Sequence, residues 1–338
     1  MGFVYHASLE EAQTDPALAA LFAPGPGTTP FDRLDWLRLI AEECLAPARC
    51  FIAVARKGDA LAALPLCEAG PGLTSLANWY SFVARPAGSD PRLLAAIARG
   101  LAPQGRLLLT PLPAEDAERL TAALGAAGWI TRTTPAHGNR HLAIAGRDFA
   151  AWWATRPGPL REVVRRKGRR LEIRIETRFD PADWALYEAL YARSWKPAEG
   201  HPAFMRRFAE AEAASGRLRL GIASHQGVAV AAQLWTVENG TAFIHKLAHD
   251  PAAAAHSPGT VLTHALFAMA FADPAIAAID FGTGDDPYKR DWMDETRQRW
   301  TIEAIHPRAM RRWPALARLL AARGADLARG RRADKAAR

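Results

Sequence analysis

The sequence of 338 residues contains only three cysteines, and their spacing argues against two kinds of scaffold. Cys44, Cys50 and Cys67 form no Cys-x-x-Cys pair and accompany no cluster of histidines. A disulfide-rich secreted domain or a structural zinc site would need such a cluster. We therefore expect a protein of a reducing compartment, with no metal ion at its functional site.

The sequence also lacks an uninterrupted run of the ~18–20 apolar residues that a membrane-spanning helix requires. The best candidate, residues 261–281, is broken by His264, Asp273 and Pro274. The chain does not open with a basic start and an apolar stretch, and Glu10 lies where a signal peptide would be apolar. These absences predict a cytoplasmic location.

Excess positive charge is missing from the body of the chain. The formal net charge is +8, and residues 308–338 hold ten basic and two acidic side chains, which accounts for the whole excess. A dedicated nucleic-acid-binding protein is basic over a much larger surface. Nucleic acid is therefore not expected as a partner, and the basic segment indicates a solvated helix or a contact with an anionic surface.

The segment 308–338 is predicted to form a basic amphipathic helix and tail. Its larger apolar residues can share one face, and they are Trp313, Leu316, Leu319, Leu320 and Leu327. Basic amphipathic helices with tryptophan commonly lie at membrane surfaces, so peripheral attachment to the inner membrane surface is one expectation. A packing helix with a solvated arginine face explains the same pattern.

Apolar periodicity and turn residues predict alternating helices and strands in both halves of the chain. In the first half, helices are predicted at 31–43, 91–101 and 115–127, and strands at 50–56, 60–67, 106–110 and 129–145. In the second half, helices are predicted at 159–170, 181–194, 202–215, 258–272 and 286–293, and strands at 171–178, 217–224, 228–237, 241–249, 276–281 and 297–305. The two halves follow the same order.

A short sequence echo supports an internal duplication. Residues 55–64 (ARKGDALAAL) resemble residues 224–233 (SHQGVAVAAQ), and Gly58 matches Gly227 at the turn. An Ala-rich strand–turn–strand would produce a similar echo, but the shared order of elements favours a tandem repeat. The predicted domains are 1–150, 151–307 and the tail 308–338.

Three local segments in the second half carry a resemblance to a known family. They are Ser194-Trp195-Lys196, then Lys246 to Asp250 leading to Ser257-Pro258-Gly259-Thr260, and finally Asp280 to Gly284 followed by Tyr288-Lys289. Together with the element order, they resemble the GNAT acyltransferases, in particular the CelD-like acetyltransferases related to the Fem aminoacyltransferases. The resemblance is specific over 160–305 and topological over 1–145. It implies an α/β (α+β) fold of two tandem GNAT-like domains, with mixed central sheets flanked by helices.

The start of the predicted helix at 258–272 is a candidate phosphate site. A helix N-terminus exposes unpaired N–H groups and partial positive charge, Gly259 permits close approach, Pro258 suits the first turn and Ser257 can cap it. An ordinary Ser-Pro helix start would look the same. The resemblance implies that this turn holds the pyrophosphate of acyl-CoA, a co-substrate rather than a tightly bound cofactor. The residues assigned to the donor are His256, Ser257, Pro258, Gly259, Thr260 and Lys246.

The strand at 241–249 carries polar residues where burial is expected. Period-2 alternation places His245, Leu247 and His249 on one face and Lys246 on the other. The resemblance implies that this strand lines the acyl group, so His245 or His249 can act as general base. Buried core histidines, with Lys246 extending to solvent at the sheet edge, are the alternative.

The pair Tyr288-Lys289 follows the strand at 276–281. The resemblance implies that Tyr288 protonates the leaving thiolate and that Lys289 stabilises the developing negative charge, since a positioned ammonium is an effective oxyanion stabiliser. A surface helix start would explain the pair as packing. The residues expected to bind substrate are Trp195, Lys196, Asp250, Asp280, Gly282 and Gly284.

The favoured function is N-acyl transfer from acyl-CoA to a primary amine by the second domain, while the first shapes the acceptor cleft. The acceptor is a lipid amine such as a sphingoid base, an amino sugar or an amino-acid derivative, and the basic tail favours the lipid. One alternative is a Fem-like transferase that takes its amino acid from aminoacyl-tRNA. The other is a non-catalytic protein that binds an anionic partner.

Overall fold

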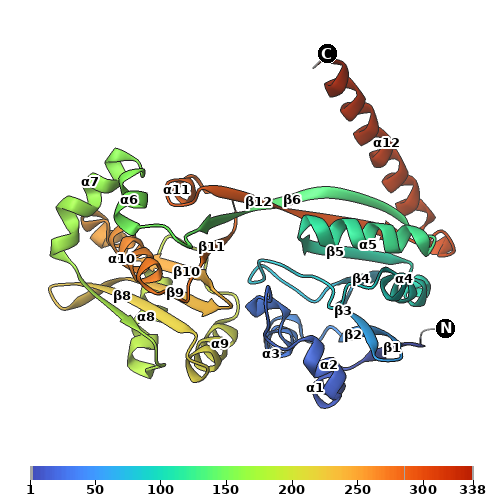
Figure 1. Cartoon of the computed structure of the whole chain (residues 1–338), viewed down its shortest axis with the longest axis horizontal. Helices are drawn as coiled ribbons and strands as arrows, with labels where there is room; N and C mark the ends of the chain where they lie inside the picture. Colours follow the sequence, from blue (N-terminus) through green and yellow to red (C-terminus); the bar gives the residue numbers. More distant parts are fainter. Residues whose placement is uncertain (1–2, 285, 337–338) are drawn as a thin grey trace. The chain divides into compact units, whose positions relative to one another are not determined.

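The computed structural model describes residues 3–284 and 286–336, and the chain forms two compact units (Figure 1). Unit 1 is built from the described parts of Met1–Ala23, Phe31–His137 and Gln298–Arg338. Unit 2 is built from the described parts of Pro24–Pro30 and Gly138–Arg297. Each unit has its own strands, helices and core.

Unit 1 has the order strand, helices, three strands, helix, strand, helix, strand. Its strands are β1 (Phe3–Ala7), β2 (Cys50–Lys57), β3 (Ala60–Ala69), β4 (Gly72–Ser75), β5 (Arg106–Leu112) and the first half of β6 (Ile130–Ala143). Its α-helices are α1 (Leu9–Thr14), α2 (Pro16–Leu21), α3 (Leu34–Ile40), α4 (Pro91–Gly100), α5 (Ala114–Ala126) and α12 (Trp313–Ala336). A buried cluster of aliphatic side chains joins α4 and α5 to the strands.

Unit 2 repeats this order after α6 (Phe149–Ala154) and α7 (Gly158–Lys167). Its strands are β7 (Glu172–Glu176), β8 (Leu218–His225), β9 (Val228–Glu238), β10 (Thr241–His249), β11 (Ala278–Thr283) and the beginning of β12 (Glu295–Ile305). Its other helices are α8 (Pro181–Arg193), α9 (Pro202–Ala214), α10 (Pro258–Ala272) and α11 (Pro287–Arg290). Large aromatic residues dominate its core, including Trp152, Trp235 and Phe267.

The two halves exchange their last strands. In unit 1, β5 pairs antiparallel with β12, for example Leu109 with Ile302. In unit 2, β11 pairs antiparallel with β6, for example Ile279 with Leu142. The borders of the compact units therefore fall inside β6 and β12 and differ from the predicted domains 1–150, 151–307 and 308–338, and the C-terminal helix belongs to unit 1. A local sequence pattern cannot show this, because it contains no information about a strand's partner.

The tandem GNAT-like order and the mixed sheets are confirmed. The strand order is β1-β2-β3-β4-β5 in unit 1 and β7-β8-β9-β10-β11 in unit 2, and only β4–β5 and β10–β11 among these neighbours are parallel. The sequence echo falls on corresponding hairpins, β2–β3 and β8–β9. Gly58 and Gly227 both occupy left-handed turn positions there, with φ of 60° and 78°.

The C-terminal helix α12 is only partly buried. Leu319 is 3% exposed, whereas Trp313 is 57% and Leu320 is 48% exposed. The predicted apolar face is thus divided between the core of unit 1 and solvent; the side chain of Leu327 lies outside the described residues, as does the end of the predicted tail. In the described part of the chain, no helix combines the length and apolar composition that crossing a bilayer requires.

Candidate functional site

The strands β10 and β11 pair only at their beginnings. The parallel ladder joins Thr241 to Ala278 and ends where Phe243 meets Asp280, although β10 continues to His249. Beyond that point the edge of β10 has no described ladder partner on the β11 side. Such an edge offers backbone N–H and C=O groups to an extended ligand, as in β-strand addition.

A β-bulge in β10 corrects the predicted faces of this strand. The register with β9 shifts between Ile244 and Lys246, so His245 is the extra residue. The His245 and Phe208 ring centroids are 4.9 Å apart, and Lys246 Nζ lies 3.4 Å from the Tyr191 hydroxyl. Consecutive residues therefore face the same helices, α8 and α9. The prediction that His245, Leu247 and His249 share one face was wrong, because one inserted residue shifts the pleat.

His249 faces α10 instead. A Cβ on Gly259 would lie 3.2 Å from His249 Nδ1, so the absence of a side chain there permits the contact. The exposed Trp195 covers the other side of the imidazole, with 4.3 Å between ring centroids. Nδ1 is buried and has no hydrogen-bond partner among the described residues, and burial lowers the pKa of His249. His249 thus lies at the N-terminus of α10.

The N-terminus of α10 is open and surrounded by cationic groups. Ser257 takes a left-handed conformation (φ 49°, ψ 48°) and makes no side-chain capping bond; its hydroxyl accepts a 2.9 Å hydrogen bond from Lys167 Nζ. His256 stacks on His225 with 4.0 Å between ring centroids. Burial, and then the charges of His225, Arg170 and Lys167, lower the pKa of His256. This arrangement favours a bound anion.

The first turn of α10 is held by a buried residue that the sequence analysis missed. Gln233 Nε2 donates to the Gly259 carbonyl at 3.3 Å and to Thr263 Oγ1 at 2.7 Å. Thr263 in turn donates to the Gly259 carbonyl at 2.8 Å. Pro258 is buried and Thr260 half-buried in the same turn, so this end of the helix is rigidly placed.

Three lysines gather where the two strands separate. Lys246 Nζ forms a 2.7 Å ion pair with Glu199. Lys196 is half-buried, and its Nζ lies 5.9 Å from the Tyr191 ring centroid. Burial, followed by the charges of Lys246 and Lys289, lowers the pKa of Lys196 to about 8. Perturbed groups of this kind are concentrated at functional sites.

Lys289 is 6% exposed, and its ammonium has few partners for a buried charge. Nζ donates to the Thr283 carbonyl at 2.5 Å and lies 3.5 Å from Asp286 Oδ2. An ammonium has three N–H donors, and the described residues give these two partners. Burial lowers the pKa of Lys289. Tyr288 is 40% exposed, and burial together with Asp286 raises the pKa of its phenol, which stays protonated.

Three residues expected to contact substrate shape the end of β11 and the turn after it. Asp280 is 5% exposed, and its Oδ1 accepts from Asn139 Nδ2 at 2.7 Å and from the Gly282 amide at 2.8 Å. Gly282 and Gly284 have φ of 68° and 98°, which favours glycine. Their contacts orient Lys289 through the turn, and substrate binding by them stays a prediction.

Asp250 also has partners within the protein. It caps the 3-10 helix η5 (Pro251–His256) by accepting from the Ala252 amide at 2.9 Å, and it pairs with Arg193 at 3.1 Å. Its carboxylate therefore fixes the path from β10 to α10. No group of three His, Cys, Asp or Glu side chains within residues 3–284 and 286–336 could hold a metal ion.

One compositional signal would have located the site. The chain has six lysines among its 43 basic residues, and four of the six lie in this region of unit 2: Lys167, Lys196, Lys246 and Lys289. Everywhere else the chain uses arginine almost exclusively. A compact ammonium, unlike a guanidinium, loses its proton readily when it is buried.

Comparison with known proteins shows what unit 2 and the whole chain are similar to. Residues 159–290 match the sequence family described as acetyltransferase (GNAT) domain. The structure resembles FemX at 9% identity with a TM-score of 0.62, over 89% of this chain and 96% of that one. It resembles a tandem GNAT protein from the clavulanic acid biosynthesis pathway at 13% identity with a TM-score of 0.54, over 89% and 98%. L-PGS from Bacillus licheniformis is similar at 14% identity with a TM-score of 0.52, over 88% and 97%. No curated protein matches the sequence.

Proposed function

Since residues 159–290 match the acetyltransferase (GNAT) domain family, we propose that unit 2 moves an acyl group from acyl-CoA to a primary amine. One observation carries this proposal: the open, cation-flanked N-terminus of α10 adjoins the unpaired edge of β10. A pyrophosphate at Ser257 and an extended pantetheine arm along β10 would bring the thioester towards the three lysines.

The donor phosphates would be held by groups of opposite charge. Backbone N–H groups in the first turn of α10 face the pyrophosphate, and Lys167 adds an ammonium 2.9 Å from the Ser257 hydroxyl. A phosphate next to His256 favours its protonated form. His249, beside Gly259, would touch the pantetheine rather than the acyl carbon. The base role proposed for His249 is therefore replaced by donor positioning.

The reaction needs a base where the strands separate. The free amine attacks the thioester carbonyl, a C–N bond forms, and the ammonium of the tetrahedral intermediate loses one proton to a base. Lys196, with a pKa of about 8, is partly neutral near neutral pH and can accept it. His245, whose Nε2 lies 2.8 Å from Thr236 Oγ1, is the second candidate.

Lys289 and Tyr288 complete the reaction. The buried Lys289 ammonium stabilises the oxyanion that forms on the thioester carbonyl oxygen. When the C–S bond breaks, the CoA thiolate takes the proton of the Tyr288 hydroxyl, and the proton that the base accepted from the amine returns to the Tyr288 phenolate through solvent. The raised pKa of Tyr288 keeps that proton available at neutral pH. The products are the amide and free CoA.

Thermal-shift titrations and turnover assays test this function directly. CoA and acyl-CoAs of several chain lengths should raise the melting temperature, because a ligand that binds only the native state stabilises it. Mass spectrometry of ligands that co-purify with the protein would identify acyl length and acceptor. If no acyl-CoA shifts the melting temperature or is turned over with any amine, the proposal fails.

We also propose a lipid amine as the acceptor, because α12 presents apolar and basic side chains together. Met310, Trp313 and Leu320 are 72%, 57% and 48% exposed, and arginines flank them. Anionic bilayers attract such surfaces. The double variant Trp313→Ser/Leu320→Ser should sediment less with anionic vesicles, whereas truncation at 307 would also remove the buried Leu319. Equal sedimentation would leave amino sugars and amino-acid derivatives as acceptors.

A Fem-like, aminoacyl-tRNA-dependent transfer is the second candidate function. The end of α7 carries Arg165, Arg166 and Lys167, the first two of them exposed, and these charges could contact tRNA phosphates. The observation that favours CoA is that Lys167 is directed to Ser257 and not into solvent. Turnover with aminoacyl-tRNA, combined with no response to acyl-CoA, would reverse this choice.

A further inference from the structure

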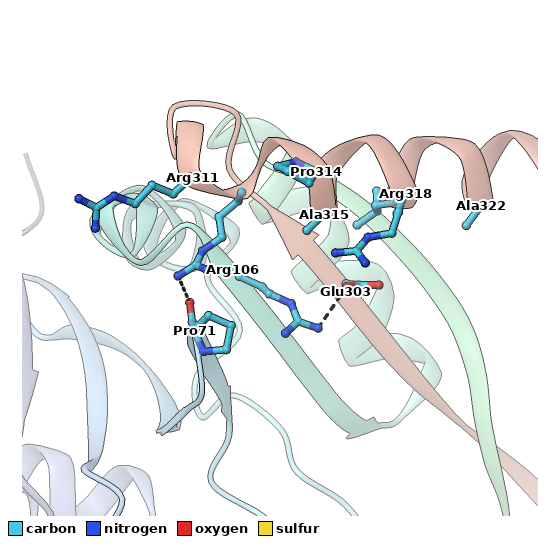
Figure 2. Close-up of a pocket in the computed structure, with 10 residues that line it drawn as sticks. Pro71, Arg106, Glu303, Arg311, Pro314, Ala315, Arg318 and Ala322 are labelled. Carbon is cyan, nitrogen blue, oxygen red and sulfur yellow. Dashed lines mark hydrogen bonds and ion pairs between the residues drawn. The ribbon is translucent and has the colours of Figure 1, made fainter.

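Unit 1 contains a cavity that the acyl transfer does not use. It has a volume of about 540 Å³ and lies beneath the start of α12 (Figure 2). Its walls come from four places: the β3–β4 turn, β5, β12, and the segment from the 3-10 helix η6 (Met310–Arg312) into α12. The charged residues that line it are Arg106, Glu303, Arg311, Arg312 and Arg318. Four arginines and one glutamate thus line the cavity.

The arginines differ in how they are held. Arg312 Nη2 donates to the Pro71 carbonyl at 2.6 Å, which attaches η6 to the β3–β4 turn. Arg106 Nη2 lies 3.3 Å from Glu303 Oε1, and Figure 2 shows this contact across neighbouring strands. Arg311 and Arg318 have no ion-pair partner in the part of the chain that the structure describes. Each is exposed, and both line the same cavity.

One N–H group of Arg106 is unsatisfied in the described part of the chain. Arg106 Nε is buried and has no hydrogen-bond partner among the described residues. Glu303 holds the far end of the same guanidinium, so Arg106 is oriented while one of its N–H groups remains unused. A buried donor without a partner costs free energy, which an anion in the cavity recovers once the Arg106 guanidinium turns its Nε towards the cavity.

We propose that this cavity binds a phosphate group, presented as a soluble phosphate or as a phospholipid headgroup. Planar guanidinium forks match phosphate oxygens geometrically, and several converging on one space stabilise more than one negative charge. After Glu303 neutralises one arginine, the lining retains three positive charges. The volume is within the range of small-molecule sites, ~300–1,000 Å³, so a headgroup-sized ligand fits.

Two substitutions on one helix test this proposal. Arg318→Gln removes an unpaired arginine from the cavity, and Arg323→Gln removes an exposed arginine that does not line it from the same helix. Both lower the net charge equally. Binding of inorganic phosphate, measured by equilibrium dialysis at constant ionic strength, should weaken about tenfold in Arg318→Gln and stay within about twofold of wild type in Arg323→Gln. Arg106→Gln should weaken it further, with circular dichroism as the control for folding.

A second arm distinguishes the two sources of phosphate. Wild type and both variants are sedimented with phosphatidylcholine vesicles, with and without about 30% phosphatidylglycerol. Loss of anionic-vesicle binding in Arg318→Gln but not in Arg323→Gln identifies a lipid headgroup. Vesicle binding that is equal in both variants, combined with selective loss of inorganic phosphate, identifies a soluble ligand. The proposal is overturned if binding of phosphate and of anionic vesicles weakens equally in both variants, because only general surface charge then acts. It is also overturned if neither variant differs from wild type in either measurement.

Discussion

The two units place a helix at the same point of the fold, yet only one of these helices has an open N-terminus. In unit 1, Asp90 caps α4, and its carboxylate accepts from the Arg92 and Leu93 amides at 2.7 and 3.4 Å. In unit 2, Ser257 makes no such bond to α10. A carboxylate at a helix N-terminus occupies the place and the charge that a phosphate would take. Under the proposed function, the donor phosphates therefore bind at α10 and not at α4.

The parallel strand pairs of the two units also differ, and again unit 1 is the one with the additional contacts. In unit 1 the β4–β5 pair continues through side chains, since Thr74 Oγ1 donates to the Leu108 carbonyl at 2.9 Å and Ser75 Oγ accepts from the Thr110 amide at 3.0 Å. In unit 2 the corresponding β10–β11 ladder ends at Phe243, and β10 then bulges. In unit 1, side-chain hydroxyls thus bridge the strands where they separate. In unit 2, the proposed function assigns the corresponding separation to an extended ligand.

The largest expected effect comes from removing the buried cation that follows β11. Lys289→Met should lower turnover about 10²–10³-fold while acyl-CoA affinity changes little, because it removes a charge that acts on the oxyanion. Tyr288→Phe should lower turnover less, since water can supply the proton. Turnover and melting temperature measured on the same samples separate catalysis from packing. Near-normal turnover in folded Lys289→Met would refute the assignment.

The next largest effect, on donor affinity, is expected when α10 receives an N-cap carboxylate like the one that Asp90 gives α4. Ser257→Asp places a carboxylate at the N-terminus, in a left-handed conformation that aspartate tolerates. The apparent affinity for acyl-CoA should fall about tenfold or more, and the melting temperature should not decrease, because the cap itself is favourable. Asp90→Ser in unit 1 is the reciprocal control and should leave donor affinity unchanged. Both are read by titration calorimetry; unaltered affinity in Ser257→Asp would exclude the pyrophosphate site.

A smaller effect is expected from one methyl group at the same turn. The Cβ of Gly259→Ala would meet His249 Nδ1 at 3.2 Å, so the imidazole must shift. We expect the KM for acyl-CoA to rise about threefold, equivalent to well under ~1 kcal/mol. Gly125→Ala in α5 of unit 1, where nothing lies within 4 Å, is the matched control and should leave KM unchanged. Equal KM values for both variants and wild type would remove His249 from the donor site.

The smallest effect concerns stability. The pKa of Lys196 in the folded protein, about 8, lies below its unfolded value of 10.5, so the unfolded chain binds more protons between these values. Stability therefore rises with pH across that window, and the penalty is complete below about pH 8. Lys196→Met should stabilise the protein near neutral pH by about 1 kcal/mol after solvent screening, and this gain should shrink towards about pH 10.5. Denaturant titrations at several pH values measure it; a pH-independent difference would contradict the shifted pKa.

Most elements could be predicted from the chain because their signals are local. The predicted strand at 241–249 and the predicted helix at 258–272 coincide with β10 and α10. Periodicity and Pro or Gly at the ends suffice for such segments. The short β4 (Gly72–Ser75) carries too few residues for a pattern, and α3 passes into a π-helix (Ala41–Leu45) inside the predicted helix 31–43.

The candidate site could be predicted in its parts but not in its arrangement. Ser257, Gly259 and Lys289 stand out by residue type and position, because capping, close backbone approach and charge are local properties. Gln233, Lys167 and Glu199 reach the site from distant segments and carry no local signal. The bulge at His245 arises from register against β9, and it moves His245 off the face that His249 occupies.

The sequence alone therefore determined the order of elements, the duplication and the chemical types available, since each follows from short-range pattern and composition. Only the tertiary structure decided which strand completes which sheet, which of two related helices keeps an open N-terminus, and that Cys50 lies opposite Cys67. It also decided that Lys196 loses its proton near pH 8, because burial and neighbouring charges set a pKa and both depend on residues far away in the chain.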